Sequence, residues 1–263
     1  MNEQLTKPIL ILDPGHGGKD PGGGSNDMFL EKDKALAISL YQAERFRELG
    51  VAATMTRSED VYLSPKERTR LVRESGAAYC ISNHINAGGG DGAEMIHSVR
   101  ADGTLAKRIG QALSSAGQNV RRVFTRTLQS RPGADYYFMH RDTGAVQTVI
   151  VEYGFADSKG DDPAQLAEEW KKFAEAVVEA FCTHVGYPYR PPSPGGADTI
   201  ELPRIQRRVE IAVVENGVIG QGYLIDGVSY VPARLAARLA GYGVEWDGQR
   251  VMLLGRGTSG SGK

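Results

Sequence analysis

The chain has only two cysteines, Cys80 and Cys182, among its 263 residues. One falls in an apolar strand-like run and the other in a helix-like segment, so we expect two buried thiols and a reducing compartment, not a disulfide framework. No apolar run is long enough to cross a bilayer. Residues 1–7 lack the basic and apolar segments of a signal peptide. We therefore expect a soluble protein, made in the cytoplasm, with no stable membrane insertion.

The chain also has little net charge, because 31 basic side chains and 32 acidic ones leave a formal value of −1. Such a balance provides no long-range attraction for a polyanion, so binding to nucleic acid is not expected. Residues 17–24 are rich in glycine, as phosphate-binding loops are, but they lack the Gly-Lys-Ser/Thr ending of such a loop. Nucleotide binding is therefore not predicted.

From residue 8 to about residue 186, strand-like and helix-like hydrophobic patterns alternate. Strands are expected at Ile9–Leu12, Val51–Thr56, Ala78–Ser82, Ala93–Val99, Tyr136–Met139 and Gln147–Val151, and helices at Lys32–Leu49, Pro65–Ser75, Gly103–Gln118 and Asp162–His184. Alternation of this kind predicts an α/β domain with a mostly parallel twisted sheet flanked by helices.

Proline and glycine are concentrated in residues 187–204, and this composition favours an extended linker after a first domain at residues 1–186. Residues 205–255 contain strand-like segments, Asn-Gly and Asp-Gly turn pairs and a helix-like segment at 233–240. These features predict a second, small α+β domain. The tail at residues 256–263 has no apolar side chain and is expected to be disordered.

One histidine stands out because of its position in the run Asp-Pro-Gly-His-Gly-Gly at residues 13–18. An apolar strand ends at this turn, so His16 is expected at the carboxyl edge of the sheet, where α/β folds place their sites. Glu31 begins the next helix, and His84 follows another apolar strand. Two imidazoles and a carboxylate are the protein ligands of a catalytic zinc. Taken singly, each residue also suits a turn, a helix start or a loop.

A carboxylate at the same edge is expected from Glu152, which ends the apolar strand that begins at Gln147. A zinc hydrolase needs a group that takes a proton from water and passes it to the leaving amine. A solvated glutamate at a strand end is the alternative interpretation. Glu94, at the start of a strand, is expected to be structural, and surface or core roles are expected for the remaining histidines, His97, His140 and His184.

Several short motifs follow one another between residues 8 and 185. They are Ile11–Asp20, Glu31–Asp33, Thr56–Arg57, Leu63–Arg68, Ser82–Ala87, Gly92–Glu94 and Val151–Phe155. In their order and content these motifs resemble the zinc-dependent N-acetylmuramoyl-L-alanine amidases of the amidase 3 type. The chain departs from that pattern at Asn83, where the family usually has an apolar residue, and at residues 156–158, which lack the common asparagine.

The resemblance implies that His16, Glu31 and His84 bind Zn²⁺ and that Glu152 is the catalytic glutamate. It implies hydrolysis of the amide bond between the lactyl group of N-acetylmuramic acid and the L-alanine of peptidoglycan. Two alternatives stay open: a zinc peptidase that acts on the stem peptide, and a catalytically inactive protein that binds cell walls.

Two aspartates near the first histidine are candidates for orienting a ligand imidazole. Asp13 precedes His16 and Asp20 follows it in the glycine-rich turn. A carboxylate that accepts a hydrogen bond from a ligand histidine fixes the orientation of its ring. Either aspartate also suits a plain turn role.

The second domain is similar to the small stalk-type domain also known as copper amine oxidase N-terminal-like, on the residues Gly222–Arg234 and Val244–Asp247. Residues 205–255 contain no histidine or cysteine, so no copper site is expected. A binding module on a linker raises the local enzyme concentration on a polymer, and we expect this domain to bind a cell-wall polymer. A stabilising or dimerising role is the alternative. The expected setting is a phage or prophage endolysin, or a lytic enzyme of a spore former.

Overall fold

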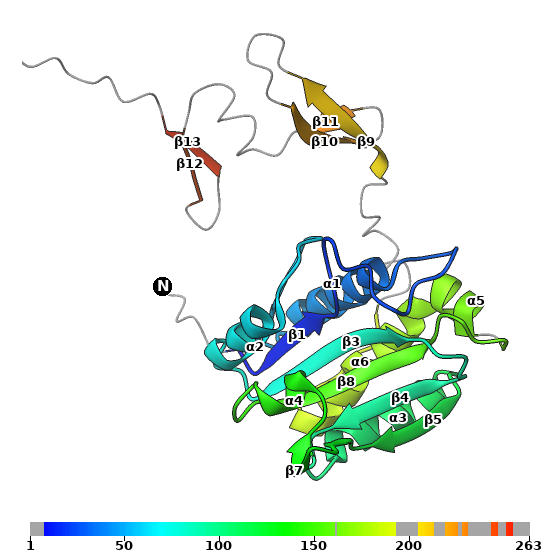
Figure 1. Ribbon diagram of the computed structural model, residues 1–263. Helices are drawn as coiled ribbons and strands as arrows, with labels where there is room; N and C mark the ends of the chain where they lie inside the picture. Colours follow the sequence, from blue (N-terminus) through cyan, green and yellow to red (C-terminus); the bar gives the residue numbers. More distant parts are fainter. Residues whose placement is uncertain are drawn as a thin grey trace, which may run out of the picture. The chain divides into compact units, whose positions relative to one another are not determined.

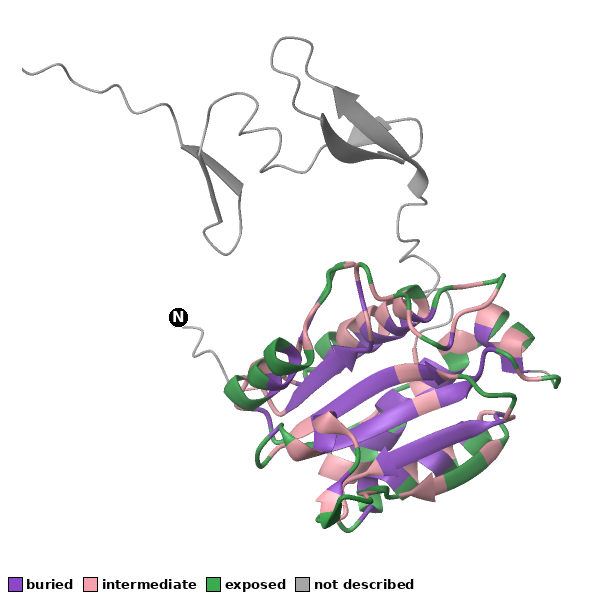
Figure 2. Cartoon of the chain, viewed as in Figure 1, coloured by how far each residue is buried: buried purple, intermediate pink, exposed green. Residues whose placement is uncertain are grey.

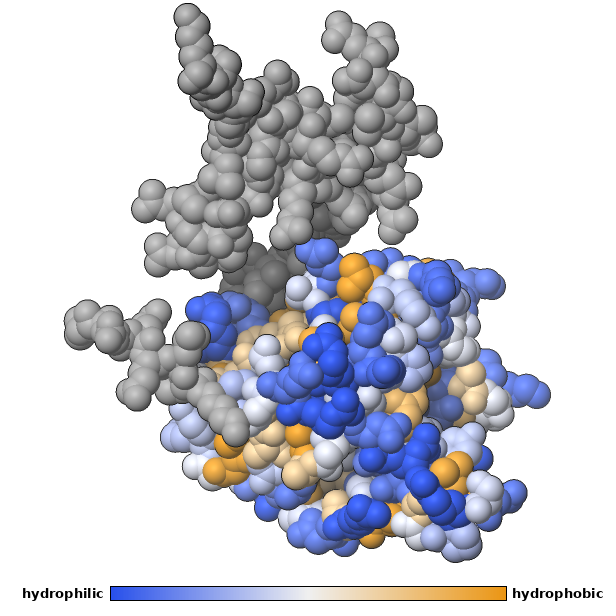
Figure 3. Space-filling view, turned by 60° about the vertical axis from the view of Figure 1, so that its left-hand side comes forward, coloured by the Kyte–Doolittle hydropathy of each residue, from blue (hydrophilic) through white to orange (hydrophobic). Residues whose placement is uncertain are grey.

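The computed structural model describes residues 8–160 and 162–192 with their side chains and, beyond them, the backbone of the strands within 205–254. The chain divides into two compact units, residues 1–192 and 193–263. Among the helices of the described segments, none has the length and apolar character needed to cross a membrane. Hydrophilic side chains cover most of the face of the first unit that Figure 3 presents.

A single sheet forms the centre of the first unit (Figure 1). Its strands are β1 (Leu10–Pro14), β2 (Ala53–Met55), β3 (Tyr79–Asn86), β4 (Ala93–His97), β5 (Val120–Phe124) and β8 (Gln147–Phe155). They lie in the order β2-β1-β3-β8-β4-β5. All neighbours pair in parallel except β4 and β8, which are antiparallel. The prediction of a mostly parallel sheet is confirmed.

Helices cover both faces of this sheet. They are α1 (Glu31–Leu49), α2 (Pro65–Glu74), α3 (Thr104–Ser115), α4 (Phe138–Arg141), α5 (Asp162–Glu168) and α6 (Trp170–Val185). Helices α1, α3 and α6 lie on one face, and α2 and α4 lie on the other (Figure 1). The larger core, which includes Ile38, Phe46 and Phe181, lies under the first group. A smaller core around Ile11, Met139 and Ile150 lies on the opposite face, so the strands are buried from both sides (Figure 2).

The boundaries of two helices follow from local sequence. Helix α2 begins with a capping box, in which the Glu67 amide donates to the Ser64 hydroxyl and the Ser64 amide donates to the Glu67 carboxylate. Pro65 occupies the first helical position. Helix α1 ends at Gly50, whose φ of 79° is the left-handed conformation that glycine adopts without strain.

Two predicted elements of the first unit are wrong in type or continuity. The expected strand Tyr136–Met139 is absent, because β7 (Arg131–Asp135), which pairs with β6 (Thr127–Leu128), ends before it and the short helix α4 begins within it. A short apolar run does not distinguish a strand from a helix, and here Met139 is buried from a helical turn. The expected single helix Asp162–His184 is broken at Glu169, whose φ of −110° interrupts the helical path.

The second unit contains a three-stranded antiparallel sheet in the order β11-β10-β9 and a two-stranded hairpin. The strands are β9 (Ile205–Ala212), β10 (Ile219–Ile225), β11 (Val228–Tyr230), β12 (Gly243–Trp246) and β13 (Val251–Leu254). Residues 193–204 of the predicted linker, the predicted helix 233–240 and the tail 256–263 lie outside the described residues. The domain boundaries proposed from the sequence stay predictions.

A buried ion pair holds the carboxyl end of β1 to the elements around it. Asp13 is fully buried, and its carboxylate accepts hydrogen bonds of 2.7 Å each from Arg68, Thr56 and Ser82. Arg68 also donates to the carbonyl oxygen of His16 at 2.7 Å. Burial by itself raises the pKa of Asp13, but Arg68 and the two hydroxyl groups hold that pKa below its usual value.

The first prediction concerns this pair. Asp13→Asn leaves the Arg68 guanidinium buried without a counter-ion, and we expect a loss of about 3–5 kcal/mol in the free energy of unfolding. Because the folded-state pKa of Asp13 is lowered, its stabilisation is present above the unfolded pKa of about 4 and is lost as the pH falls further.

Urea unfolding of the parent and the variant between about pH 3 and pH 7 measures both effects. The parent should lose stability more steeply than the variant as the pH falls below about 4. Asp27→Asn is the control, because Asp27 is exposed, and it should change the free energy of unfolding by less than about 0.5 kcal/mol. Parallel pH profiles for the parent and Asp13→Asn would show that the pair does not carry this stability.

Candidate metal centre and active site

Three side chains from separate elements meet at the carboxyl edge of the sheet. His16 lies on the turn after β1, Glu31 is the first residue of α1, and His84 lies on β3. His16 Nε2 is 3.1 Å and His84 Nδ1 is 3.0 Å from the same oxygen, Glu31 Oε1. One ligand atom from each residue lies within 4.8 Å of the other two. The structure thus brings together the three residues that the sequence predicted as a metal site.

The backbone of His16 adopts an unusual conformation. Its φ of 56° makes it the one non-glycine residue with a positive φ in the described part of the chain. Such a conformation costs about 1–3 kcal/mol and persists where the surroundings impose it. Here Arg68 donates a hydrogen bond to the His16 carbonyl oxygen. The Gly17 amide donates to the Asp20 carbonyl oxygen at 3.0 Å.

The orientation of the His16 ring is set by Asp20. His16 Nδ1 lies 2.8 Å from Asp20 Oδ2, which directs Nε2 toward Glu31. Of the two aspartates that the sequence left open for this role, Asp20 makes the contact, and Asp13 instead binds Arg68. A carboxylate placed behind an imidazole in this way is the usual second partner of a metal-binding histidine.

The sequence analysis expected His84 just after a strand at Ala78–Ser82. In the structure β3 continues to Asn86, so His84 lies within the strand. The ring packs closely on the turn after β1. A Cβ atom added at Gly15 would lie 2.3 Å from the His84 ring, so a side chain at this position would displace the imidazole. The glycine of the Asp-Pro-Gly-His run is therefore needed for the approach of the second histidine.

The environment of Glu31 keeps its carboxylate ionised. Glu31 is 2% exposed, and its carboxylate accepts hydrogen bonds from the backbone amides of Gly24 at 2.8 Å and Ile85 at 3.1 Å. Burial by itself raises the pKa of Glu31, but His16 and His84 hold that pKa well below its usual range. Two imidazole nitrogens converge on one carboxylate oxygen. This donor set fits a divalent ion such as zinc.

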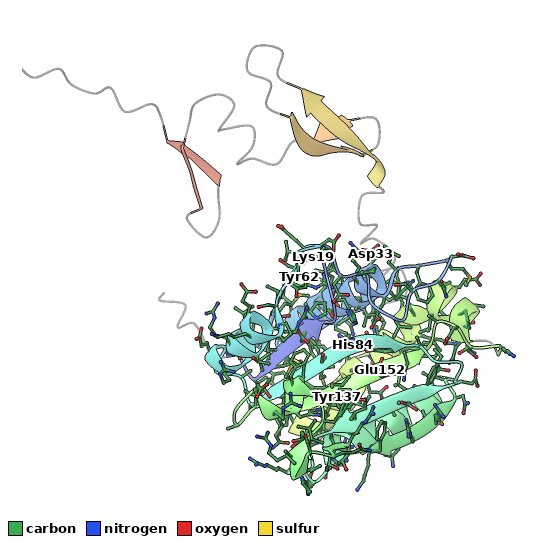
Figure 4. The ribbon with its side chains drawn as sticks, in the orientation of Figure 1. Lys19, Asp33, Tyr62, His84, Tyr137 and Glu152 are labelled. Atoms are coloured by element: carbon green, nitrogen blue, oxygen red, sulfur yellow. The ribbon has the colours of Figure 1, made fainter. Side chains whose placement is uncertain are left out.

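Glu152 lies beside the cluster on β8, where it is paired in register with His84 of β3 (Figure 4). Its Oε2 atom is buried and has no hydrogen-bond partner among the described residues. Burial of the carboxyl group raises the pKa of Glu152 to about 7, with His84 opposing and Glu31 adding to the shift. A buried carboxylate oxygen without a partner is rare in folded proteins and marks a place where a further group binds or reacts.

A cavity of about 210 Å³ gives access to these groups. His16, His84 and Glu152 contribute to its wall. Tyr62 and Tyr137 also line it, and Figure 4 shows that they come from the loop before α2 and the turn before α4. A larger cavity of about 420 Å³ lies near the beginning of β8 and contains none of the clustered residues. The smaller cavity is therefore the candidate active site.

The sequence analysis did not place Glu94 near the site. In the structure Glu94 lies next to Glu152. Strand β4 is antiparallel to β8, so the start of β4 lies at the carboxyl edge and Glu94 is paired in register with Glu152. Glu94 is 2% exposed and is held by the side chain of Asn86 at 3.1 Å and by two arginines. Only the direction of β4 reveals this position, and no local sequence pattern specifies that direction.

Comparison with known proteins identifies the family of the chain. Residues 10–183 match the family described as N-acetylmuramoyl-L-alanine amidase. The chain belongs to this family. The match spans more than half of the chain and includes each of the clustered residues together with Glu152.

The amidase family is also represented among individual relatives. The uncharacterized protein YqiI of Bacillus subtilis is 29% identical over 185 residues, which are 68% of this chain and 87% of YqiI. The sporulation-specific N-acetylmuramoyl-L-alanine amidase of Bacillus subtilis is 36% identical over 162 residues, 58% of each protein. The structure of Cwp6 from Clostridium difficile has a TM-score of 0.63 at 29% identity and covers 68% of this chain and 29% of Cwp6. The chain thus spans little more than half of the named sporulation amidase.

Beneath the cluster, Asn83 belongs to a buried polar network. The Asn83 amide group donates to Ser39 and to Gln42 at 2.8 Å each. Its carbonyl oxygen accepts from the Tyr153 hydroxyl at 3.0 Å. Since Asn83 directly precedes His84 on β3, the network fixes α1 against the strand that carries the second histidine.

The second prediction follows from this network. Asn83→Leu places an apolar residue at this position but leaves buried polar groups of Gln42 and Tyr153 short of a partner, so we expect a loss of about 1–3 kcal/mol in the free energy of unfolding. The triple variant that adds Gln42→Leu and Tyr153→Phe removes the polar groups that Asn83→Leu leaves unpaired and should recover part of the loss. Urea unfolding of the single and triple variants measures this, and an unchanged midpoint in Asn83→Leu would contradict it.

Proposed function

We propose that the chain is a zinc-dependent enzyme that hydrolyses the amide bond between the lactyl group of N-acetylmuramic acid and the L-alanine of peptidoglycan. Membership of the amidase family supports peptidoglycan as the substrate. The observation that carries zinc dependence is the convergence of His16 Nε2, His84 Nδ1 and Glu31 Oε1. Two imidazoles and one carboxylate leave a coordination position open, as catalytic zinc sites do.

The bound ion would supply positive charge that polarises the substrate carbonyl group and lowers the pKa of water toward neutrality. The chain holds the rest of the machinery. Glu31 would offset part of the charge of the ion, and Asp20 keeps the His16 ring in place. The cavity around these groups is open to a substrate amide.

Glu152 is the group that moves the proton. Its buried Oε2 has no hydrogen-bond partner in the part of the chain that the structure describes, so it can accept a proton from the attacking water. The oxygen of that water joins the lactyl carbonyl carbon, the carbon–nitrogen bond breaks, and Glu152 passes the proton to the leaving nitrogen of L-alanine. A pKa of about 7 suits a group that must accept and then release a proton near neutral pH.

The third prediction separates proton transfer from metal binding. Glu152→Gln keeps the shape of the side chain but removes its basicity, so kcat should fall by about a hundredfold to ten-thousandfold while bound zinc is retained. Mass spectrometry of purified walls measures the new lactyl carboxylates and L-alanine amino termini. The control is Glu74→Gln, a 60% exposed side chain on α2 that should leave the rate unchanged. Equal rates in Glu152→Gln and the parent would rule out the assigned role.

The fourth prediction concerns the metal. His84→Ala should lower the bound zinc from about one ion per chain to a small fraction, because one of three protein ligands is lost. His184→Ala, which changes a histidine of α6 outside the cluster, should retain it. Elemental analysis after dialysis gives the metal content. Release of terminal amino acids from the stem would instead favour a peptidase, and zinc-loaded parent protein that binds walls without cutting them would favour a binding protein.

The second unit is proposed to bind a cell-wall polymer. This proposal is supported by the composition of residues 187–204 and by the likeness of Gly222–Arg234 to the stalk-type domain. A tethered binding module raises the effective concentration of the enzyme on an insoluble polymer. A stabilising or dimerising role remains the alternative. The setting also stays a prediction: lysis by a phage or prophage enzyme made in the host cytoplasm, or wall lysis in a spore former.

The fifth prediction tests the second unit with a chain that ends at Pro192, the boundary of the first compact unit. This chain should cleave a soluble muropeptide as fast as the parent but should sediment with purified walls about tenfold less. Sedimentation is compared in the Glu152→Gln background, so that the walls stay intact. Equal sedimentation of both chains would contradict wall binding, and a changed oligomeric state would favour dimerisation.

A further inference from the structure

Four neighbouring strands place polar side chains in one row on the face that carries the metal cluster. His84 of β3 is paired with Glu152 of β8, Glu152 with Glu94 of β4, and Glu94 with Arg122 of β5. Residues paired in register point to the same face of a sheet. Neighbouring strands are about 4.8 Å apart, so the backbone of Arg122 lies about 10 Å from that of Glu152.

The far end of this row carries an excess of positive charge. Arg121 and Arg122 both bind the buried Glu94 carboxylate, at 3.0 Å and 2.8 Å. Two guanidinium groups therefore share one negative charge. The Arg122 side chain is 51% exposed and that of Arg121 is 46% exposed, so both remain open to solvent. Arg122 Nη1 and Arg121 Nη2 have no hydrogen-bond partner within the segments that the structure describes.

Aromatic rings hold these guanidinium groups in place. Arg122 lies 4.0 Å from the centre of the Phe124 ring, and Arg121 lies 5.4 Å from that of Phe155. Stacking on rings and bonding to Glu94 together limit the rotation of both side chains. A guanidinium held in a fixed direction loses little conformational entropy when it binds a carboxylate, and the Nη donors that Glu94 does not occupy can donate to the carboxylate oxygens.

We propose that Arg122, together with Arg121, forms a subsite for a carboxylate of the stem peptide, at the second or third residue beyond the bond that is cut. This proposal rests on the proposed amidase function. An extended peptide advances about 3.3–3.6 Å per residue, so three residues span the distance from Glu152 to Arg122. The subsite makes the enzyme selective for stems whose carboxylates are free over stems in which they are amidated.

The test compares two soluble muropeptides, an N-acetylmuramyl tripeptide with free side-chain and α-carboxylates and the same compound with these groups amidated. In the full-length zinc-loaded parent, kcat/KM for the acid form should exceed that for the amide form about tenfold, as expected for one charge-assisted hydrogen-bonded pair. In Arg122→Gln the ratio should fall to about one to three, through a raised KM for the acid form.

The controls separate a binding role from a structural one. Arg70→Gln removes an arginine of similar exposure that is also paired with a glutamate, Glu74, and should keep the ratio of the parent. Arg122→Lys retains the charge without the planar donors and should give an intermediate ratio. A purely structural role of Arg122 would lower the unfolding temperature and slow both substrates equally. An unchanged ratio in Arg122→Gln would therefore overturn the proposal.

A binding measurement distinguishes this proposal from the proposed function. Calorimetry follows the free tripeptide product, as acid and as amide, with Glu152→Gln protein carrying either Arg or Gln at position 122. Selective binding of the acid that requires Arg122 would support the subsite even if the parent cut neither muropeptide, in which case the amidase function fails. Hydrolysis of both muropeptides with equal binding in the two proteins would overturn the subsite and leave the amidase function standing.

Discussion

The buried pair between Asp13 and Arg68 is the interaction on which the site depends. It joins the end of β1 to α2, and Thr56 and Ser82 complete the environment of the carboxylate. Because Arg68 also binds the His16 carbonyl oxygen, the pair helps to hold His16 at its positive φ. The fold thus uses a fully buried charge to impose a backbone conformation that the sequence would not adopt by itself.

The order of the strands determines which side chains, besides that of His16, line the cavity. Strand β3 lies between β1 and β8, so His84 stands between the turn of His16 and the carboxylate of Glu152. Most charged groups along this edge have partners within the chain. Among the residues that the structure describes, the Glu152 Oε2 atom and the outer donors of the arginines on β5 have no hydrogen-bond partner. These are the groups available to a substrate.

The sequence predicted the parts of the site that depend on local features. A glycine-rich turn after an apolar strand located His16, a helix start located Glu31, and an apolar strand located Glu152. Non-local features were not predictable. The antiparallel direction of β4, which brings Glu94 next to Glu152, depends on pairing between distant segments. The run Tyr136–Met139 suits a short strand as well as a helix, and tertiary packing decides between them.

X-ray absorption at the zinc edge, on the zinc-loaded full-length chain, tests the central claim most directly. The account predicts two imidazole nitrogens and a carboxylate oxygen at about 2.0–2.2 Å, with no sulfur ligand at about 2.3 Å. In His84→Ala, any zinc that remains bound should have one imidazole ligand. A spectrum with a sulfur ligand, or with the same number of imidazoles in the parent and in His84→Ala, would contradict the assignment of the cluster as the metal centre.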